Sequence, residues 1–421
     1  MLQVAVVGAG VAGLASAIAL RRAGASVTVF ERRSGPATGG AGVLLQPSGL
    51  VALAAIGGAL DPESPAIRRL EGRRRDGKRV LDLDYGRYPA GNGRGVVRAT
   101  LVNRLLALAE AAGVAFRFAS PVTAITGHAG GAALRGVGKG TWDLIVVADG
   151  AHSPLRETVA PVDRTRAYDW SALWALVPLP GDWPRDVLQQ RYHRGDRMAG
   201  ILPVAQGRGK PAVGTFFWSV RHDAVTAWRQ APLQEWKAAV LRLWPSLAPI
   251  VDAFRTHDDL HVATYRDARP SRWHRGRVVL VGDAAHGTSP QLGNGVTLAL
   301  GDAVVLARAL ARAPDIPAGL NAYERERRTA VRFTNLCDSI ARSQRHCAVS
   351  RQGAGASAWR GSRQASATPP RRRAVAPHGW PCAPPWTALL VAHVDLATPR
   401  SSRLATAAHT ATETWQYFRK G

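Results

Sequence analysis

The chain has 421 residues, which is long enough for two or three domains and a large buried core. Hydrophobic residues make up 46% of the chain and charged residues 20%, so a wholly disordered protein is excluded. No charge-free apolar run reaches the length of a spanning helix, so no membrane span is expected. Only three cysteines are present, all beyond residue 336, which excludes a disulfide scaffold and a cysteine-built metal site in the main body. This cysteine usage is typical of a cytoplasmic protein.

The net charge is +25, and the isoelectric point is near 11.4. Such an excess indicates a nucleic acid or an anionic membrane as partner when it is concentrated on one face. Here the last 77 residues supply +9, and the rest is spread over 344 residues. The one dense cluster, Arg68 to Arg79, predicts two short strands around a turn at Asp76 and Gly77. We therefore expect a solvated basic surface and no nucleic-acid partner.

The first thirty residues predict a strand, a helix and a second strand. Residues 2–7 are apolar and β-branched, as in a buried parallel strand. A helical pattern follows over 11–23 and ends at Gly24, and Ser26 to Phe30 predicts the next strand. This is the opening of a parallel α/β domain.

The turn between the first strand and the helix carries chemistry. Gly8, Gly10 and Gly13 form a G-x-G-x-x-G motif, whose glycines let a backbone approach a pyrophosphate at the helix N-terminus. Glu31 stands 18 residues after Gly13 at the end of the second strand, where its carboxylate can accept hydrogen bonds from ribose hydroxyls. The pattern predicts dinucleotide binding but does not choose between NAD and FAD.

The following elements indicate two domains. A helix is expected over 100–112 and strands over 114–126 and 143–148. From 165 to 270 tryptophan is frequent and strand-like runs appear, with one helix over 232–244. Within this stretch Phe216, Phe217 and Trp218 alternate sides, so at least one of them should face a core.

The first pattern returns later in the chain. Val278 to Val281 predicts a strand, and 294–312 predicts a helix that is apolar nearly all round and therefore buried. We thus expect a discontinuous domain over 1–164 and 271–344, interrupted by a β-rich domain over 165–270.

Two further motifs sit at strand ends. The strand over 143–148 runs into Asp149 and Gly150, and the strand ending at Val281 runs into Gly282 and Asp283. An aspartate 270 residues after the glycine turn suits an elongated cofactor, held by one end at the first strand and by the other near the late helix.

These three motifs in this order resemble the class A flavoprotein monooxygenases, the para-hydroxybenzoate hydroxylase-like aromatic-ring hydroxylases, over roughly residues 2–340. The resemblance implies an α/β fold, with a Rossmann-like FAD-binding domain and an inserted β-rich substrate domain. It also implies bound FAD, with NADH or NADPH as a transient co-substrate. Reduced flavin would react with O2 to give a C4a-hydroperoxide, which hydroxylates an aromatic or polyketide-like small molecule.

The resemblance also places the cofactor. The positions that match the family's cofactor-binding positions are Gly8, Gly10, Ala12, Gly13, Glu31, Arg32, Arg98, Val122, Asp149, Gly150, Asp283, Pro290, Gly293, Asn294, Gly295, Val296 and Thr297. The first four would cradle the pyrophosphate, and the next two would hold the adenosine ribose. Arg98 would reach the FAD, the backbone of Val122 would lie near the adenine, and Asp149 with Gly150 would serve both FAD and the nicotinamide cofactor. Asp283 would bind the ribityl chain, and the backbone of 293–297 would pass along the flavin ring.

The helix beginning near Asn294 would direct its positive end at the flavin and stabilise the anionic reduced form by roughly 0.3–2 kcal/mol. The tryptophan-rich domain could build an apolar roof over the reaction, although aromatic side chains in a sheet are more often core. His193 could polarise a phenol, but a structural histidine is the commoner case. No catalytic acid or base and no metal site are assigned.

Three alternatives stay open. Residues 345–421 contain no isoleucine, seven prolines and no sustained period, so this irregular basic segment is either a disordered tail or a shifted reading frame of a GC-rich gene. The enzyme could be another FAD oxidoreductase of the same fold, such as an epoxidase or an isoprenoid reductase. It could also be a catalytically impaired flavoprotein.

Overall fold

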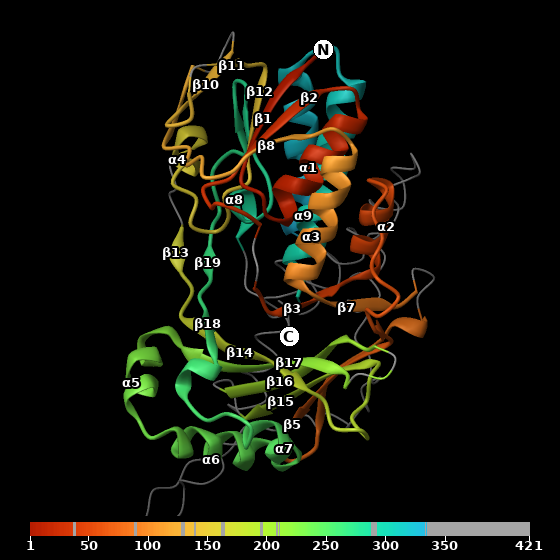
Figure 1. The fold of residues 1–421 in the computed structure, drawn as a ribbon, viewed down its shortest axis with the longest axis vertical. Helices are drawn as coiled ribbons and strands as arrows, with labels where there is room; N and C mark the ends of the chain where they lie inside the picture. The colour runs from red at the N-terminus through yellow and green to blue at the C-terminus, as the bar shows by residue number, and fades with distance from the viewer. Residues whose placement is uncertain are drawn as a thin grey trace, which may run out of the picture.

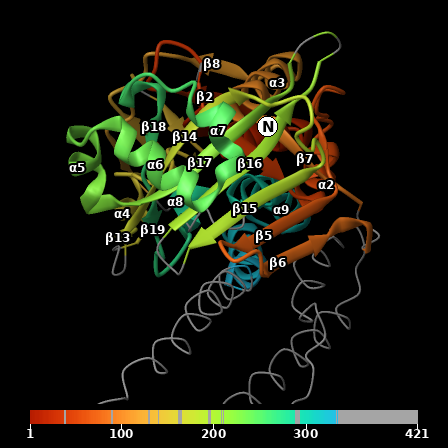
Figure 2. The ribbon, with the colours of Figure 1, turned by 90° about the horizontal axis from the view of Figure 1, so that it is seen from below.

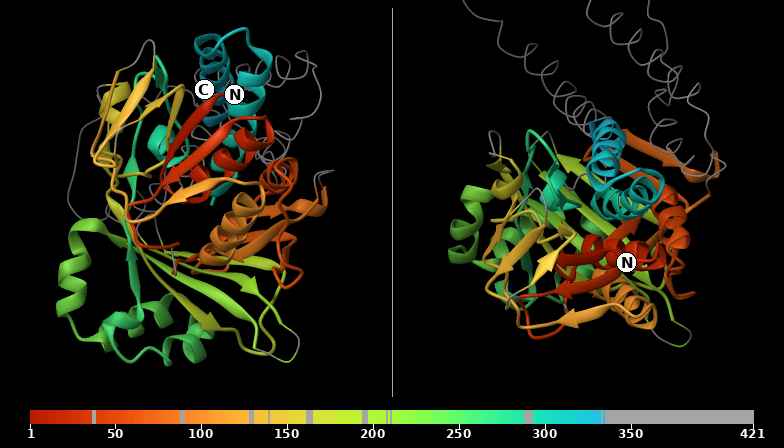
Figure 3. Two further views of the ribbon diagram at one scale, coloured as in Figure 1. Left: turned by 45° about the horizontal axis from the view of Figure 1, so that its top comes forward. Right: turned by 90° about the horizontal axis from the view of Figure 1, so that it is seen from above.

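The computed structural model describes residues 1–36, 39–87, 91–127, 131–138, 140–160, 165–193, 197–207, 209, 211–287, 293–332 and 334. These residues form two halves, one built on a mainly parallel sheet and the other on a seven-stranded sheet (Figure 1). The left view of Figure 3 shows the green strands of the second half at the bottom and the red and cyan helices of the first half above them. The predicted α/β fold, with a Rossmann-like part and a β-rich part, is confirmed.

The first half is centred on a six-stranded sheet with the order β20-β21-β12-β1-β2-β8. Its strands are parallel except for β20 at the edge. Val6 on the central strand pairs with Val29 on one side and with Val146 on the other, as expected for apolar strands buried on both faces. The strands are β1 (Gln3–Val7), β2 (Ser26–Phe30), β8 (Ala115–Arg117), β12 (Leu144–Val147), β20 (His274–Arg275) and β21 (Val278–Leu280).

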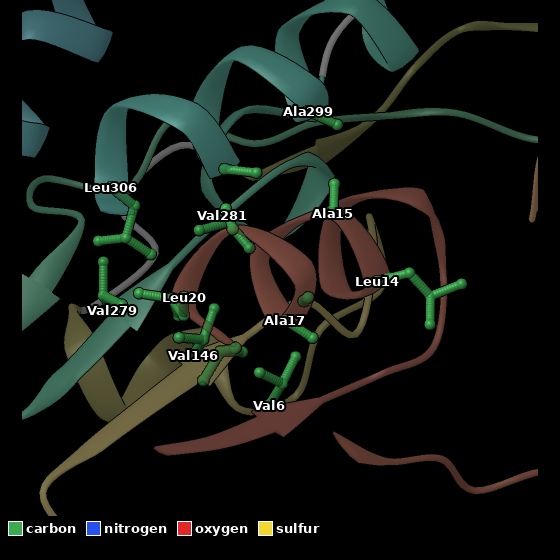
Figure 4. Close-up of a cluster of buried hydrophobic side chains, with 14 of the residues drawn as sticks. Val6, Leu14, Ala15, Ala17, Leu20, Val146, Val279, Val281, Ala299 and Leu306 are labelled. Atoms are coloured by element: carbon green, nitrogen blue, oxygen red, sulfur yellow. The ribbon is translucent and has the colours of Figure 1, made fainter. Parts of the chain in front are cut away.

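Helix α1 lies between this sheet and α9. Figure 4 shows the side chains of Leu20, Val146, Val279 and Leu306 directed toward one another across this contact, and each is at most 2% exposed. Helix α9 carries a broad buried face, as its apolar pattern predicts. The helices of this half are α1 (Val11–Arg22), α2 (Pro47–Ala55), α3 (Arg98–Ala111), α4 (Arg156–Val159), α8 (Asp283–His286), α9 (Gly295–Arg312) and a helix over 316–332.

The second half is a sheet with the order β18-β14-β17-β16-β15-β5-β6. Neighbouring strands are antiparallel except for β15 and β5. Helices α6 and α7 cover one face of it (Figure 2), where Phe216 meets Trp236 with ring centroids 6.1 Å apart. The strands are β5 (Arg69–Arg74), β6 (Arg79–Asp84), β14 (Trp170–Pro178), β15 (Val187–His193), β16 (Arg197–Ala205), β17 (Val213–Arg221) and β18 (His261–Ala263).

Short elements complete the two halves. One small sheet has the order β3-β7-β4, a second has the order β11-β10-β9, and β13 pairs with β19 where the chain crosses between the halves. These strands are β3 (Gly42–Leu45), β4 (Ala66–Ile67), β7 (Gly93–Val97), β9 (Ala124–Thr126), β10 (Ala132–Arg135), β11 (Thr141–Trp142), β13 (Arg166–Ala167) and β19 (Arg266–Asp267). The remaining helices are α5 (Val225–Gln230), α6 (Leu233–Leu243) and α7 (Ala248–Val251), with 3-10 turns η1 (Tyr85–Arg87), η2 (His222–Ala224), η3 (Pro245–Leu247) and η4 (His257–Asp259).

The strand prediction over 114–126 is wrong in one respect. The segment forms two strands, β8 and β9, which belong to different sheets. The break falls at Ala119, whose φ of +50° turns the chain, and at Pro121, which has no backbone N–H for a sheet.

The paired strands expected around Asp76 and Gly77 are confirmed as β5 and β6, and Gly77 has a φ of +81°. These strands pair with β15, so the seven-stranded sheet includes residues 69–84 from the first part of the chain. The domain division at 164/165 and 270/271 stays a prediction. The pairing of β5 with β15 crosses this division, because β5 belongs to the first segment and β15 to the second.

Residues 345–421 and Pro290 lie outside the described residues, so the predictions made for them stay predictions. Among the residues that are described, no helix is long and apolar enough to cross a membrane.

Candidate functional site

Three turns meet at the carboxyl ends of the parallel strands β1, β12 and β21. A Cβ on Gly8 would lie 2.6 Å from the carbonyl oxygen of Ala148 and 3.3 Å from the Cα of Asp149. A Cβ on Gly282 would lie 2.6 Å from the Cβ of Ala12. The three predicted motifs are therefore in contact, at the edge of an open α/β sheet where ligands bind.

The glycines of the first turn have different surroundings. Gly8 has a φ of +107°, and a Cβ on Gly13 would overlap the carbonyl oxygen of Gly8 and lie 3.0 Å from its carbon. Nothing lies within 4 Å of a Cβ built on Gly10. Packing therefore requires Gly8 and Gly13, whereas Gly10 faces open space.

Glu31 lies at the end of β2, directly beside the glycine turn. One oxygen of its carboxylate accepts a hydrogen bond of 2.8 Å from the backbone N–H of Ala9. The carbonyl of Glu31 accepts the N–H of Ser120 at 2.9 Å, which brings the segment containing the half-buried Val122 to the same corner. Arg32 is exposed there. The structure thus places Glu31, Arg32 and Val122 together.

The second and third turns are joined by Arg156, whose side chain is 2% exposed. Its Nε donates to the carbonyl of Ala284 at 2.7 Å. One terminal nitrogen donates to the carbonyl of Ala151 at 2.9 Å and to that of Asp283 at 3.1 Å. Arg156 stands near Asp149 and Gly150 in the sequence, but no sequence pattern predicted its role. It holds the two turns in one position.

Asp149 presents a buried carboxylate at this junction. Its Oδ1 is buried and has no hydrogen-bond partner within the part of the chain that the structure describes. Burial raises the pKa of Asp149, although a hydrogen bond from Ser153 opposes the shift. Gly150, which follows, has a φ of +93° and open space around a Cβ.

The start of α9 lies next to the third turn. A Cβ on Gly295 would lie 3.9 Å from the Oδ1 of Asp283, which is exposed. Gly293 has a φ of +64°, and its Cβ would lie 3.6 Å from the Cβ of Leu44 on β3. Asn294 is 8% exposed, and its Nδ2 has no partner among the described residues. A buried amide without a partner is costly unless a ligand or water satisfies it.

A second contact fixes the first turn of α9. The hydroxyl of Thr297 accepts the backbone N–H of Gln46 at 3.2 Å, and Val296 packs against the main core. The hydroxyl of the fully buried Tyr85 donates to the side-chain oxygen of Gln46. Gln46 and Tyr85 were not predicted as site residues, because neither lies in one of the three motifs.

Arg98 begins α3 beside a segment that precedes β3. Its backbone N–H donates to the carbonyl of Ala41 at 3.1 Å. A Cβ on Gly40 would lie 3.2 Å from the Cβ of Arg98, so the absence of a side chain at Gly40 leaves room for it. The side chain of Arg98 is exposed.

One face of the seven-stranded sheet is turned toward β3 and β7 of the first half (Figure 1). The strand register aligns Trp174, Phe217, Gly200, Gln190 and Gly72 in one row across this face. A Cβ on Gly200 would overlap the ring of Phe217, so this glycine lets the ring lie flat on the sheet. The row thus combines aromatic rings with a buried amide.

The neighbours of this row show which side chains lie on each face of the sheet. Tyr192, two residues after Gln190 on the same face, donates to the Gln190 side-chain oxygen at 2.5 Å, and both are buried. The opposite face carries Phe216 and Trp218, which pack in the core with α6, as the alternation of these residues predicts. His193 falls on that opposite face by strand parity, so the structure gives no support for a role on the substrate.

The comparison with known families decides the identity. A family described as "FAD binding domain" matches residues 1–334. The chain belongs to this family. The predicted resemblance to the class A FAD-dependent aromatic hydroxylases is confirmed, as is FAD as the cofactor.

Similar proteins agree on the class of enzyme. The chain is 32% identical to a 2-heptyl-3-hydroxy-4(1H)-quinolone synthase of Mycobacteroides abscessus, with 77% of this chain and 86% of that protein covered. It is 32% identical to a 3-amino-4-hydroxybenzoate 2-monooxygenase of Streptomyces platensis, with 78% and 85% covered. The structure of Klebsiella pneumoniae HpxO complexed with FAD and uric acid matches with a TM-score of 0.69 and 27% identity, covering 82% of this chain and 88% of that one. The chain is an FAD-dependent monooxygenase.

Proposed function

We propose that this monooxygenase uses NADH or NADPH together with O2 to hydroxylate an aromatic or polyketide-like small molecule in the cytoplasm. The aromatic substrate class is supported by the names of two relatives, one a synthase of a hydroxyquinolone and the other a monooxygenase of an aminohydroxybenzoate. The observation that carries the proposal is the convergence of the three turns and the start of α9, together with a sheet face that bears Trp174 and Phe217 and is turned toward β3 and β7.

The glycine turn and α1 fit the pyrophosphate of FAD. The first N–H groups of a helix have no partner within the helix. Gly10 provides no side-chain cap for α1, and the first turn contains no acidic residue. With open space at Gly10, these N–H groups can hold an anion at the positive end of the helix. We assign Gly8, Gly10, Ala12 and Gly13 to this part of FAD.

The other predicted residues extend the same site. Glu31 and Arg32, with the backbone of Val122, are assigned to the adenosine end, because they share one corner beside the glycine turn. Asp283 is assigned to the ribityl chain, because it lies between the glycine turn and the start of α9. Arg98 is assigned to the FAD through its position beside β3.

The start of α9 fits the isoalloxazine ring. This helix also has no side-chain cap and no acidic residue in its first turn. Residues 293–297 would therefore direct N–H groups and the positive helix end at the ring, which favours negative charge there. The unpartnered amide of Asn294 supplies one more donor.

When bound, FAD supplies the redox chemistry that transfers electrons from the nicotinamide cofactor to O2 and one oxygen atom to the substrate. The protein's part is to orient the substrate and to exclude water. Trp174 and Phe217 provide apolar surface for this on the sheet face, and the paired Gln190 and Tyr192 provide polar groups. Asp149 and Gly150 are assigned to both FAD and the nicotinamide cofactor, because this turn borders the glycine turn.

We also propose that the chain divides into an FAD-binding domain over 1–164 and 271–344 and a substrate domain over 165–270. The strands of the two large sheets, apart from β5 and β6, support this division. In this division β5 and β6 belong to the first segment of the chain but lie in the sheet of the substrate domain.

An absorbance spectrum of the purified protein from about 300 to 550 nm is the first test, with the released flavin identified by chromatography. Two flavin bands and released FAD are expected. Oxidation of NADH and NADPH is then measured with uric acid, 3-amino-4-hydroxybenzoate and alkylquinolones as probes, in the presence of ¹⁸O2. Product containing one ¹⁸O atom supports the proposal. Reduction of a probe without oxygen incorporation would favour another FAD oxidoreductase, and a colourless protein that takes up no FAD would refute the proposed site.

A further inference from the structure

A cluster of ionisable side chains is buried behind the predicted flavin site. Asp302 on α9 is 0% exposed, and its partners His286 and Arg327 are 3% and 6% exposed. One carboxylate oxygen accepts the Nε2–H of His286 at 2.6 Å, and the other accepts the Nε–H of Arg327 at 2.7 Å. None of the predicted site residues belongs to this cluster.

Asp302 joins two segments that the proposed function assigns to the flavin. The same oxygen that accepts from His286 accepts the backbone N–H of Gly282 at 2.8 Å. Gly282 directly precedes Asp283 and has a φ of +58°. On the other side, Arg327 donates to the carbonyl of Leu298 at 3.0 Å, one residue after the 293–297 segment. One carboxylate thus fixes both the third turn and the first turn of α9.

The surrounding residues are shaped around this cluster. A Cβ on Gly301 would lie 3.2 Å from the guanidinium of Arg327, so the absence of a side chain lets Arg327 cross α9 there. The ring of Trp273 packs on His286 with centroids 5.2 Å apart. Burial alone would raise the pKa of Asp302, but the electrostatic interactions and hydrogen bonds with His286 and Arg327 lower it to about 2, so the carboxylate is ionised at neutral pH.

Stability alone does not account for such a cluster. A buried ion pair is often no more stabilising than apolar residues of the same volume, because the charges lose their hydration. What hydrogen-bonded charges provide and apolar contacts do not is one defined position for each partner. Here the positioned groups are the backbone on both sides of the predicted flavin.

We propose that Asp302 is a positioning residue for the flavin. Through Gly282 and Arg327 it sets the position of Asp283 relative to the backbone N–H groups at the start of α9. The proposal rests on the flavin site proposed above. It assigns Asp302 no contact with the cofactor.

The test compares three variants with the wild-type chain. Asp302→Asn leaves the Arg327 cation without its carboxylate. The double variant Asp302→Leu with Arg327→Met removes the Asp302–Arg327 ion pair and replaces it with apolar side chains. The matched control is Glu326→Gln, which removes an exposed ion pair with Arg308 between the same two helices, away from the site.

For each variant we would measure the melting temperature of the apoprotein, the Kd for FAD by fluorescence titration, and the spectrum and reduction potential of the bound flavin. We expect the double variant to fold with a lowered melting temperature, because the buried N–H groups of Gly282 and His286 lose their acceptor. Its Kd for FAD should rise at least tenfold, and the spectrum or potential of its flavin should shift. Glu326→Gln should match the wild type in every measurement, and Asp302→Asn should shift the flavin in the same direction as the double variant.

Two outcomes would overturn the proposal. In the first, the double variant binds FAD with wild-type affinity, spectrum and potential, so the cluster has no effect on the flavin. In the second, neither Asp302 variant folds, so the cluster is needed by the core itself. A wild-type chain that binds no FAD would instead refute the proposed function, so the two failures are distinguishable.

Discussion

Replacing single glycines of the first turn separates their packing role from their cofactor role. Gly13→Ala places a methyl group over the carbonyl oxygen of Gly8, 3.0 Å from its carbon, and both neighbours are backbone. The strand and the helix would have to separate, because neither group can rotate away. Overpacking usually costs about 1–3 kcal/mol, and a collision with rigid backbone belongs at the upper end. We expect the free energy of unfolding of apo Gly13→Ala to fall by about 3 kcal/mol.

Gly10→Ala should leave the apoprotein almost unchanged. Nothing lies within 4 Å of the new methyl group, and the φ of −81° at Gly10 suits alanine. Alanine lowers the entropy of the unfolded chain, which stabilises by about 0.4–1 kcal/mol, and it is a poorer helix N-cap than glycine by a similar amount. The methyl group would, however, occupy the space that the pyrophosphate needs. We expect the Kd for FAD to rise at least about tenfold, which corresponds to ~1.4 kcal/mol.

Gly24→Ala is the control for backbone strain alone. Gly24 has a φ of +92°, nothing surrounds its Cβ, and it lies at the far end of α1. Alanine there should cost about 1–2 kcal/mol of stability without changing the Kd for FAD. Urea unfolding of the three apoproteins and flavin titration of the folded ones provide the data. If Gly10→Ala binds FAD as the wild type does, or unfolds as easily as Gly13→Ala, the reasoning is refuted.

Three further predictions concern single side chains. Because burial raises the pKa of Asp149, the ionisation of its carboxyl opposes folding. Apo Asp149→Asn should therefore have a higher melting temperature than the wild type at pH 7. The difference in melting temperature should vanish as the pH falls below about 3.9, the ordinary pKa of aspartate. Arg156→Met should lower the free energy of unfolding in urea by at least about 3 kcal/mol, because buried carbonyls lose a charged donor. Arg68→Met, at an exposed ion pair, should lower it by less than about 1 kcal/mol. Equal losses would contradict the role of Arg156 in joining the second and third turns. Trp174→Ala should raise the KM of an accepted substrate at least about tenfold and leave the Kd for FAD unchanged. Trp218→Ala, on the opposite face of the sheet, should instead lower the free energy of unfolding by about 3–5 kcal/mol. A loss of stability in Trp174→Ala and a raised KM in Trp218→Ala would exchange the roles of the two residues.

Local pattern predicted the first half of the fold closely. The strand over Ser26–Phe30 and the helices α1, α3 and α9 form where apolar periodicity and glycine positions placed them. The chain also turns where the three motifs predicted turns. Local pattern failed at 114–126, because which sheet a strand joins depends on partners far away in the sequence. The same limit explains why β5 and β6 were predicted as strands but not as members of the seven-stranded sheet.

Several basic residues of the Arg68–Arg79 cluster form ion pairs with nearby acidic residues, which a count of basic residues alone leaves out. Arg69 forms an ion pair with Asp82, and Arg73 forms one with Glu71, at 2.7 Å each. Asp82 also pairs with Arg79 on the edge strand β6. Charged side chains on an edge strand hinder pairing with another chain. Arg79 and Asp82 therefore protect the edge at β6, and the ion pairs neutralise part of the cluster's charge.

The candidate site divides into residues that motifs can predict and residues that they cannot. The glycines can be predicted because a tight turn needs a residue that accepts a positive φ. The acidic residues can be predicted because they directly follow strands that the apolar pattern indicates. Arg156 and Asp302 act across 128 and 25 residues, on Ala284 and Arg327 respectively. One signal was present: Asp302 is an acidic residue inside a helix whose apolar pattern predicts burial, and a buried carboxylate requires partners. The sequence could therefore indicate that a buried polar contact exists, but only the fold identifies the turn that it holds.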